Sequence, residues 1–203
     1  LEEYIRRQYP GFKLISSTTK RITGLDGLLE ELNKDYFLVV LDYDLNHNEE
    51  VLSAIGKQAD KVEILVNEIC YPGCPKRSEH YRQQSQMQLE YDIDAAFPCP
   101  NKTRERKFEE CKERPSFISR EQIREYADRG FVNFKIVGRG MPMDFVKESY
   151  LYYLVKDDSR AFIRNKMEST LNHNIYLDFV DQDGRFYYIF FNHQVFINGP
   201  LYF

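Results

Sequence analysis

Short apolar runs alternate with longer amphipathic stretches along most of this chain, and the runs have the length and composition of β-strands. They are rich in β-branched and aromatic residues, as strands of folded proteins are. The second run is apolar almost throughout, which favours a strand buried on both faces, as in a parallel sheet. We expect strands over residues 12–15, 36–41, 62–66 and 131–137.

The amphipathic segments between these runs predict helices. Leucines at positions 25, 28, 29 and 32 lie on one helical face. Asn48 is a suitable N-cap, and Ser119 with Gln122 has the spacing of a capping box. Regular alternation of strands and helices predicts parallel β/α units. We expect helices over residues 25–32, 49–59, 120–129, 150–155 and 161–171.

The last part of the chain departs from this rhythm. Residues 176–180 and 186–191 are apolar and aromatic, and they flank Asp183 and Gly184, a strong signal for a hairpin turn. We therefore expect an aromatic β-hairpin tail over residues 173–203.

The predicted fold class is α/β: a partial or complete TIM-like β/α barrel with parallel strands, plus the C-terminal β-hairpin. The barrel portion covers residues 1–172 and contains a cysteine-bearing insert over residues 68–118. The chain has 203 residues, fewer than the roughly 250 of a complete eight-stranded barrel. We therefore expect a missing N-terminal barrel half, or a partner chain, to cover an edge of the sheet.

Composition narrows the class of protein. The apolar fraction of 42% and the charged fraction of 30% are those of a globular protein. We expect no membrane span and a cytoplasmic location, because no run reaches about 20 apolar residues and no export signal is visible. The net charge of −4 argues against binding nucleic acid by bulk charge alone.

Polar residues follow each predicted strand. In a parallel β/α array these loops open on one face, where such folds carry their chemistry. Lys20, Asp42, Asp44, Glu68 and Arg139 all lie in such loops. Polar residues commonly follow strands, so each position alone is weak evidence. Together they predict a site in which Glu68, Asp42 and Lys20 act on substrate while Asp44 and Arg139 bind it.

All four cysteines of the chain lie in the insert, at Cys70, Cys74, Cys99 and Cys111. Four thiolates suit an iron–sulfur cluster or a tetrahedral zinc ion, and the lack of a Cys-x-x-Cys pair favours the cluster. Free thiols that pack as small apolar residues are the alternative.

Two residues next to the first cysteine pair complete the predicted site. Arg77 is a cation that would lower the pKa of a nearby thiol and hold an anionic substrate. His80 is a further candidate for substrate binding, although an isolated histidine is more often structural.

The segment from Asn67 to Arg77, followed by His80 and Tyr81, resembles the collagenase-like peptidase family, also called unassigned-peptidase family 32. The resemblance extends over roughly residues 10–156 and implies the second half of that family's barrel. It also implies a four-cysteine iron–sulfur (4Fe-4S) cluster in which Cys70 and Cys74 match the motif. Cys99 and Cys111 match only as later cysteines at an unfamiliar spacing.

Our leading hypothesis is an iron–sulfur-dependent enzyme of this family with redox or hydroxylation chemistry on a small molecule or an RNA base, as the resemblance implies. One alternative is a zinc-stabilised or metal-free β/α binding module that uses the same face. A second alternative is a peptidase, because the family name comes from that activity.

Overall fold

The computed structural model describes residues 1–90, 97–99, 106–138, 141–174, 179–180 and 186–187. The chain divides into two compact units. Unit 1 comprises Leu1–Glu105 and Lys112–Lys135, and unit 2 comprises Arg106–Cys111 and Ile136–Phe203.

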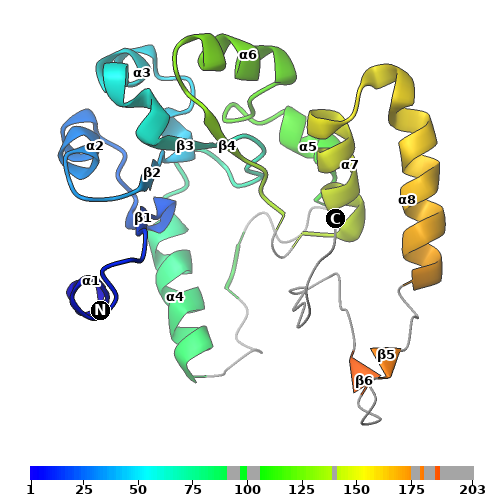
Figure 1. The fold of residues 1–203 in the computed structure, drawn as a ribbon, viewed down its shortest axis with the longest axis horizontal. Coiled ribbons are helices and arrows are strands. Elements are labelled where there is room, and N and C mark those ends of the chain that lie inside the picture. Colours follow the sequence, from blue (N-terminus) through cyan, green and yellow to red (C-terminus); the bar gives the residue numbers. More distant parts are fainter. Residues whose placement is uncertain (91–96, 100–105, 139–140, 175–178, 181–185, 188–203) are drawn as a thin grey trace. The chain divides into compact units, whose positions relative to one another are not determined.

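Unit 1 is built on a parallel sheet, which the described part of the chain shows as four strands in the order β1-β2-β3-β4 (Figure 1). Ile15 pairs with Leu38, Val39 with Val62, and Ile64 with Phe134. Parallel β/α units are therefore confirmed, and the sheet is compatible with part of a β/α barrel. The strands are β1 (Ile15–Ser16), β2 (Leu38–Val40), β3 (Val62–Leu65) and β4 (Asn133–Lys135).

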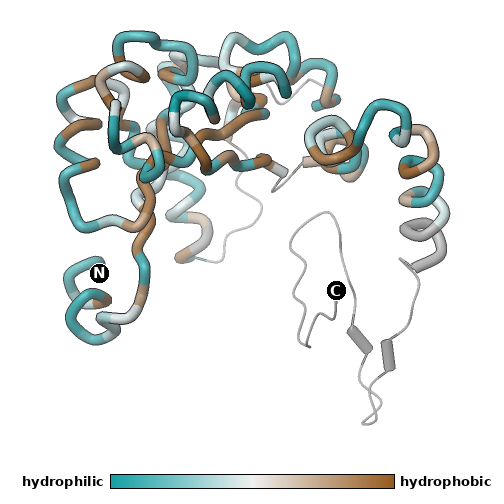
Figure 2. The backbone as a smooth tube through the Cα atoms, turned by 45° about the horizontal axis from the view of Figure 1, so that its top comes forward, coloured by the Kyte–Doolittle hydropathy of each residue, from teal (hydrophilic) through white to brown (hydrophobic). Residues whose placement is uncertain are grey.

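The core of unit 1 lies along β2 and β3 and under two amphipathic helices. Val39 and Ile64 are buried in the middle of the sheet, and Figure 2 shows the strands as the most hydrophobic part of this unit. Helix α2 (Leu25–Leu32) buries Leu28 and Leu32, which are two of the leucines on its predicted face.

Helix α3 (Glu49–Ile55) is shorter than the expected segment of residues 49–59. Asn48 caps it as predicted, by accepting a hydrogen bond from the backbone N–H of Val51. The α-helix ends because Gly56 has a positive φ of 53°, a conformation that glycine adopts at little cost. The chain continues as the 3₁₀ helix η3 (Gly56–Lys61).

The remaining helices of unit 1 include one with a predicted cap and a glycine just after its end. Ser119 and Gln122 form the predicted capping box, and Gly130 follows the end of that helix with a positive φ of 95°. These helices are α1 (Glu2–Gln8), η1 (Thr18–Lys20), η2 (Tyr43–Leu45), α4 (Arg77–Glu90) and α6 (Arg120–Asp128).

Unit 2 contains a helical pair, α7 (Met143–Leu154) and α8 (Arg160–Asn174), joined through η5 (Asp157–Ser159). Helix α7 begins earlier than expected, directly after Pro142, because charged residues in its first turns hide the apolar pattern. Arg164 donates Nε and Nη2 to the two carboxylate oxygens of Glu148, at 2.8 and 2.7 Å.

Helix α5 (Phe108–Lys112) begins in unit 2, where Phe108 packs against the ring of Phe145. Strand β5 (Phe179–Val180) pairs antiparallel with β6 (Phe186–Tyr187), as the hairpin prediction requires. The predicted turn at Asp183 and Gly184 lies outside the described residues. No helix within the described ranges has the length and apolarity to cross a membrane.

Candidate functional site

Two aspartates lie directly after β2, at the carboxyl edge of the sheet of unit 1. Asp42 is only 2% exposed. Its Oδ1 accepts a hydrogen bond from the backbone N–H of Asp44 at 3.1 Å, which caps η2. Its Oδ2 accepts from the guanidinium of Arg21. The short turn therefore fixes both carboxylates at the edge where the next loop also arrives.

That next loop brings Arg77, the first residue of α4, onto the aspartates. Arg77 is 1% exposed, and its Nη1 lies 3.1 Å from Asp44 and 3.7 Å from Asp42. Its guanidinium carbon lies 3.8 Å from the ring centroid of Tyr43, and Nη2 donates to the carbonyl of Tyr71. Arg77 thus joins the segments that follow β2 and β3, as the sequence led us to expect.

Arg21 is the second cation of this group, and it was not among the predicted site residues. It follows η1 in the left-handed region, with φ 57° and ψ 49°, which is uncommon for a residue other than glycine. Its Nη2 lies 3.1 Å from Asp44. We call Asp42, Asp44, Arg21 and Arg77 the charge network. In it, the charges of two carboxylates and two guanidinium groups compensate one another.

Burial and pairing have different effects on the two aspartates of the charge network. Burial raises the pKa of Asp42, while the Asp44 N–H and Arg21 act in the opposite direction. Burial also works to raise the pKa of Asp44, but hydrogen bonds from the Gly73 backbone and Arg21, and the charge of Arg77, hold it below its usual range. The arginines thus stabilise the charged carboxylates in a site poor in water.

Glu68 lies beside this network in the loop after β3. Its Oε1 accepts a hydrogen bond from the backbone N–H of Cys70 at 3.0 Å. The side chain is partly exposed, yet the surrounding protein raises the pKa of Glu68, against the opposing effects of that N–H and of Arg77. A carboxyl with a raised pKa in a cleft of polar groups is a common arrangement at functional sites.

Cys70 adjoins the same network. Burial raises the pKa of its thiol, whereas Tyr43 and Arg77 lower it. Both groups act on the thiol as hydrogen-bond donors, and Arg77 also acts through its charge. They stabilise a thiolate at Cys70 against the opposing effect of burial.

Lys20 lies in a different set of contacts from the one expected. Its Nζ donates to Glu31 at 2.5 Å and to the hydroxyl of Tyr36 at 2.7 Å. Glu31, on α2, also accepts from Ser16 and Lys34. Lys20 therefore holds η1 onto α2, and a catalytic role for it remains a prediction.

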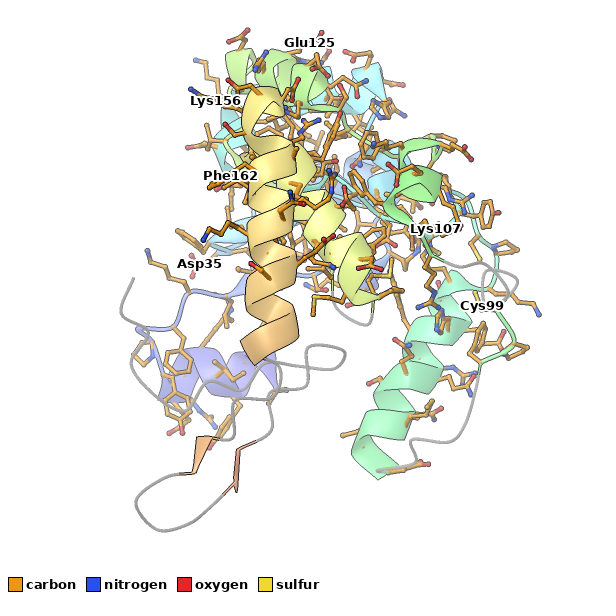
Figure 3. The ribbon with its side chains drawn as sticks, turned by 90° about the vertical axis from the view of Figure 1, so that its right-hand side faces the viewer. Asp35, Cys99, Lys107, Glu125, Lys156 and Phe162 are labelled. Carbon is orange, nitrogen blue, oxygen red and sulfur yellow. The ribbon has the colours of Figure 1, made fainter. Side chains whose placement is uncertain are left out.

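The four cysteines are divided between the units. Cys70 and Cys74 flank the turn before α4, and Figure 3 shows Cys99 near the first turns of that helix. Cys111 belongs to unit 2 and is fully buried, with 0% exposed. Among the residues that the structure describes, no three His, Cys, Asp or Glu side chains form a group that could hold a metal ion. The metal assignment thus stays a prediction.

His80 lies on α4 and stacks on Phe97, with ring centroids 4.6 Å apart and an interplanar angle of 10°. This contact fastens residues 97–99 to α4, which suits a structural role, and its predicted role in substrate binding is untested. Arg139, the last predicted substrate-binding residue, lies outside the described residues.

Sequence reasoning missed three charged residues that the structure places around the strand ends. Arg21 adjoins Lys20 in a strand-end loop, so its position was a usable signal. Glu31 follows an apolar helical face, and Arg114 lies in a loop far along the chain. Neither residue had a sequence signal that would have marked it as part of the site.

Comparison with known proteins gives one match. No family model matches the chain, and no solved structure matches it. The chain is 28% identical over 189 residues to an uncharacterized protease of Methanocaldococcus jannaschii, covering 88% of this chain. It spans about half of that relative, 54% of its length. The match is consistent with the resemblance to the collagenase-like peptidase family that the segment around Cys70 indicated.

Proposed function

We propose that this chain is part of an iron–sulfur-dependent enzyme that performs redox or hydroxylation chemistry on a small molecule or an RNA base. Substrate binds at the carboxyl edge of the parallel sheet, over Glu68 and the charge network. The observation that carries the proposal is the junction at Arg77. This one buried side chain ties the aspartates after β2 to the loop that holds Glu68, Cys70 and Cys74.

The charge network supplies a rigid floor for such a site. Asp42 and Arg77 are buried and held by several partners each, so their positions change little when a substrate arrives. Preorganised charges of this kind orient a polar substrate without a further cost of reorganisation. Glu68 differs from them, because the residue is partly exposed and burial of its carboxyl raises the pKa of Glu68, which suits a group that exchanges a proton with a substrate.

The residues near Cys70 fit an anionic cluster in their chemistry. Thiolates are the ligands that iron–sulfur clusters take. The Tyr43 hydroxyl and the Arg77 guanidinium, which lower the pKa of the Cys70 thiol, are donors of the kind that stabilise the negative charge of cluster sulfur. Cys70, Cys74 and Cys99 of unit 1 would hold the cluster, while the assignment of Cys111 as a ligand stays a prediction. A bound cluster supplies one-electron redox chemistry.

A second candidate is a peptidase, because the archaeal relative is called a protease, although its activity is uncharacterized. A zinc-stabilised or metal-free binding module is the third hypothesis. Metal content separates these from the leading proposal, because only the first requires iron and sulfide together.

The test is anaerobic reconstitution of the full chain with iron and sulfide, followed by visible absorbance. We expect a broad charge-transfer band in the wild type, and its loss in Cys70→Ser and in Cys74→Ser. Ser78→Ala is the control, because Ser78 is exposed at the start of α4, close to both thiols. This control should keep the band.

Two results would overturn the proposal. One is a wild type that binds no iron although it remains folded by circular dichroism. The other is a band of equal strength in both cysteine variants, which would place any iron elsewhere on the chain.

A further inference from the structure

Arg114 is a buried arginine outside the charge network. It follows α5 in unit 1, and only 8% of its surface is exposed. Its guanidinium carbon lies 3.9 Å from the ring centroid of Tyr71, so the two planar groups are in cation–π contact. Its carbonyl accepts the N–H of Phe117 at 3.0 Å, which fixes the loop around it.

The side-on edge of Arg114 is buried. Its Nε and Nη2 make no hydrogen bond to any residue that the structure describes. These two atoms form the edge with which arginine binds two oxygens of a carboxylate or a phosphate. The contact with Tyr71 lies on the face of the guanidinium and does not replace the hydrogen bonds that these two N–H groups would make with water.

Arg164 shows what this edge does when it is occupied. Its Nε and Nη2 donate to the two oxygens of Glu148, at 2.8 and 2.7 Å. In Arg164 the Nε/Nη2 edge is thus paired with a carboxylate, whereas in Arg114 the same edge makes no hydrogen bond to a described residue.

Arg114 is linked to the proposed active site through Tyr71. The ring of Tyr71 stacks on Arg114, and its backbone carbonyl accepts from Arg77. Ser116, two residues further on, also has a buried hydroxyl without a hydrogen-bond partner among the described residues.

We propose that Arg114 binds an oxyanion of the substrate, a carboxylate or a phosphate, through its Nε and Nη2 edge. This inference names a charged group on the ligand of the proposed site, and it does not depend on bound iron. The two nitrogens are buried, so the oxyanion reaches them only when neighbouring side chains shift. The ring of Tyr71 lies over the face of the guanidinium and leaves its in-plane edge for the oxyanion.

The test follows the arginine Nε–H signals of the ¹⁵N-labelled full chain by NMR during titration with inorganic phosphate or with acetate. Sodium chloride keeps the ionic strength constant, so that screening does not change. We expect a saturable shift of the Arg114 signal, which is assigned by its absence from Arg114→Lys. The Arg164 signal is the internal control and should not move, because Glu148 already fills its edge. A response to phosphate alone or to acetate alone identifies the source of the oxyanion.

Two variants separate binding from structure. Arg114→Lys keeps the charge and removes the two-nitrogen edge, and we expect about tenfold weaker binding of the same anion. Arg114→Met keeps much of the packing on Tyr71, and we expect its melting temperature to equal or exceed that of the wild type.

Three results would overturn this inference: no shift with either anion, a shift of Arg164 as large as that of Arg114, or equal affinity in Arg114→Lys. A clear loss of melting temperature in Arg114→Met, with no anion response in the wild type, would assign Arg114 a structural role. If the protein binds no iron but Arg114 responds, the proposed function fails while this subsite stands.

Discussion

Arg77 is the residue on which the candidate site depends. It is buried, it lies between two aspartates, and it packs on Tyr43. Buried ion pairs of this kind add little net stability over apolar packing, but removal of one partner leaves a charge without compensation. The charge network therefore fixes the geometry of the strand ends more than it stabilises the fold.

Asp42→Asn should lower the free energy of unfolding by about 3–5 kcal/mol, because it leaves the charges of Arg21 and Arg77 underbalanced in a buried site. The control is Asp35→Asn. The Asp35 side chain is 100% exposed and pairs with Arg6 at the surface, so its substitution should change the free energy of unfolding far less than Asp42→Asn does. Urea denaturation measures both. Equal effects of the two substitutions would refute the buried network.

Glu31 should make stability depend on pH in acid. Burial works to raise its pKa, but hydrogen bonds from Lys20, Lys34 and Ser16 lower it from 4.5 to about 2. A lowered pKa stabilises the fold above pH 4.5, and this contribution is lost as the pH falls toward about 2. The stability difference between wild type and Glu31→Gln should therefore shrink across that interval.

Denaturation curves at a series of pH values measure this difference. Glu30→Gln is the matched control, because Glu30 precedes Glu31 on the same helix and its side chain is 75% exposed. Its difference from wild type should be small throughout. A Glu31→Gln difference that stays constant down to the lowest pH would contradict the ion-pair assignment.

Position after a strand predicted where Asp42, Asp44 and Glu68 lie, because parallel strands bring the residues that follow them to one edge, while their catalytic and binding roles stay predictions. Arg77 was predicted from its closeness to Cys70 in the sequence. Arg21 and Arg114 were missed, since long side chains reach partners that sequence spacing does not reveal. For Lys20 the position of the loop was predicted correctly, but its ammonium group pairs with Glu31 on α2 rather than with the charge network.

At the level of elements, local signals decided where helices begin and end. Asn48 and the Ser119 capping box were read correctly, because a cap involves only residues three positions apart. The strands are shorter than the apolar runs that predicted them, although Phe37, Leu41 and Val66, just outside the strands, still donate backbone hydrogen bonds to the neighbouring segment. The start of α7 was missed because its first turns carry Asp144 and Lys147, which pair with each other at 2.7 Å.

Ser119→Ala should destabilise unit 1 by about 1 kcal/mol, because it removes the side chain that caps α6. Ser85→Ala is the control. Ser85 is exposed in the interior of α4, where alanine is the better helix former, so stability should be unchanged or slightly higher. Thermal unfolding distinguishes the two, and equal melting temperatures would argue against the capping box.

At the level of the whole molecule, the repeated β/α pattern predicted a parallel sheet, and the structure shows four such strands in the described part of unit 1. Closure of a barrel stays a prediction, because it depends on strands that pair across long sequence distances. The division after residue 172 and the grouping of four cysteines are predictions as well. The chain spans 54% of its archaeal relative, so the activity of a whole protein of this kind is a proposal here.

The most direct measurement of the central claim is the content of iron, acid-labile sulfide and zinc in the wild-type chain purified without oxygen. Our account predicts iron and sulfide in equal amounts, bound to the folded protein. Zinc without sulfide, or a folded protein that retains no metal, would contradict it.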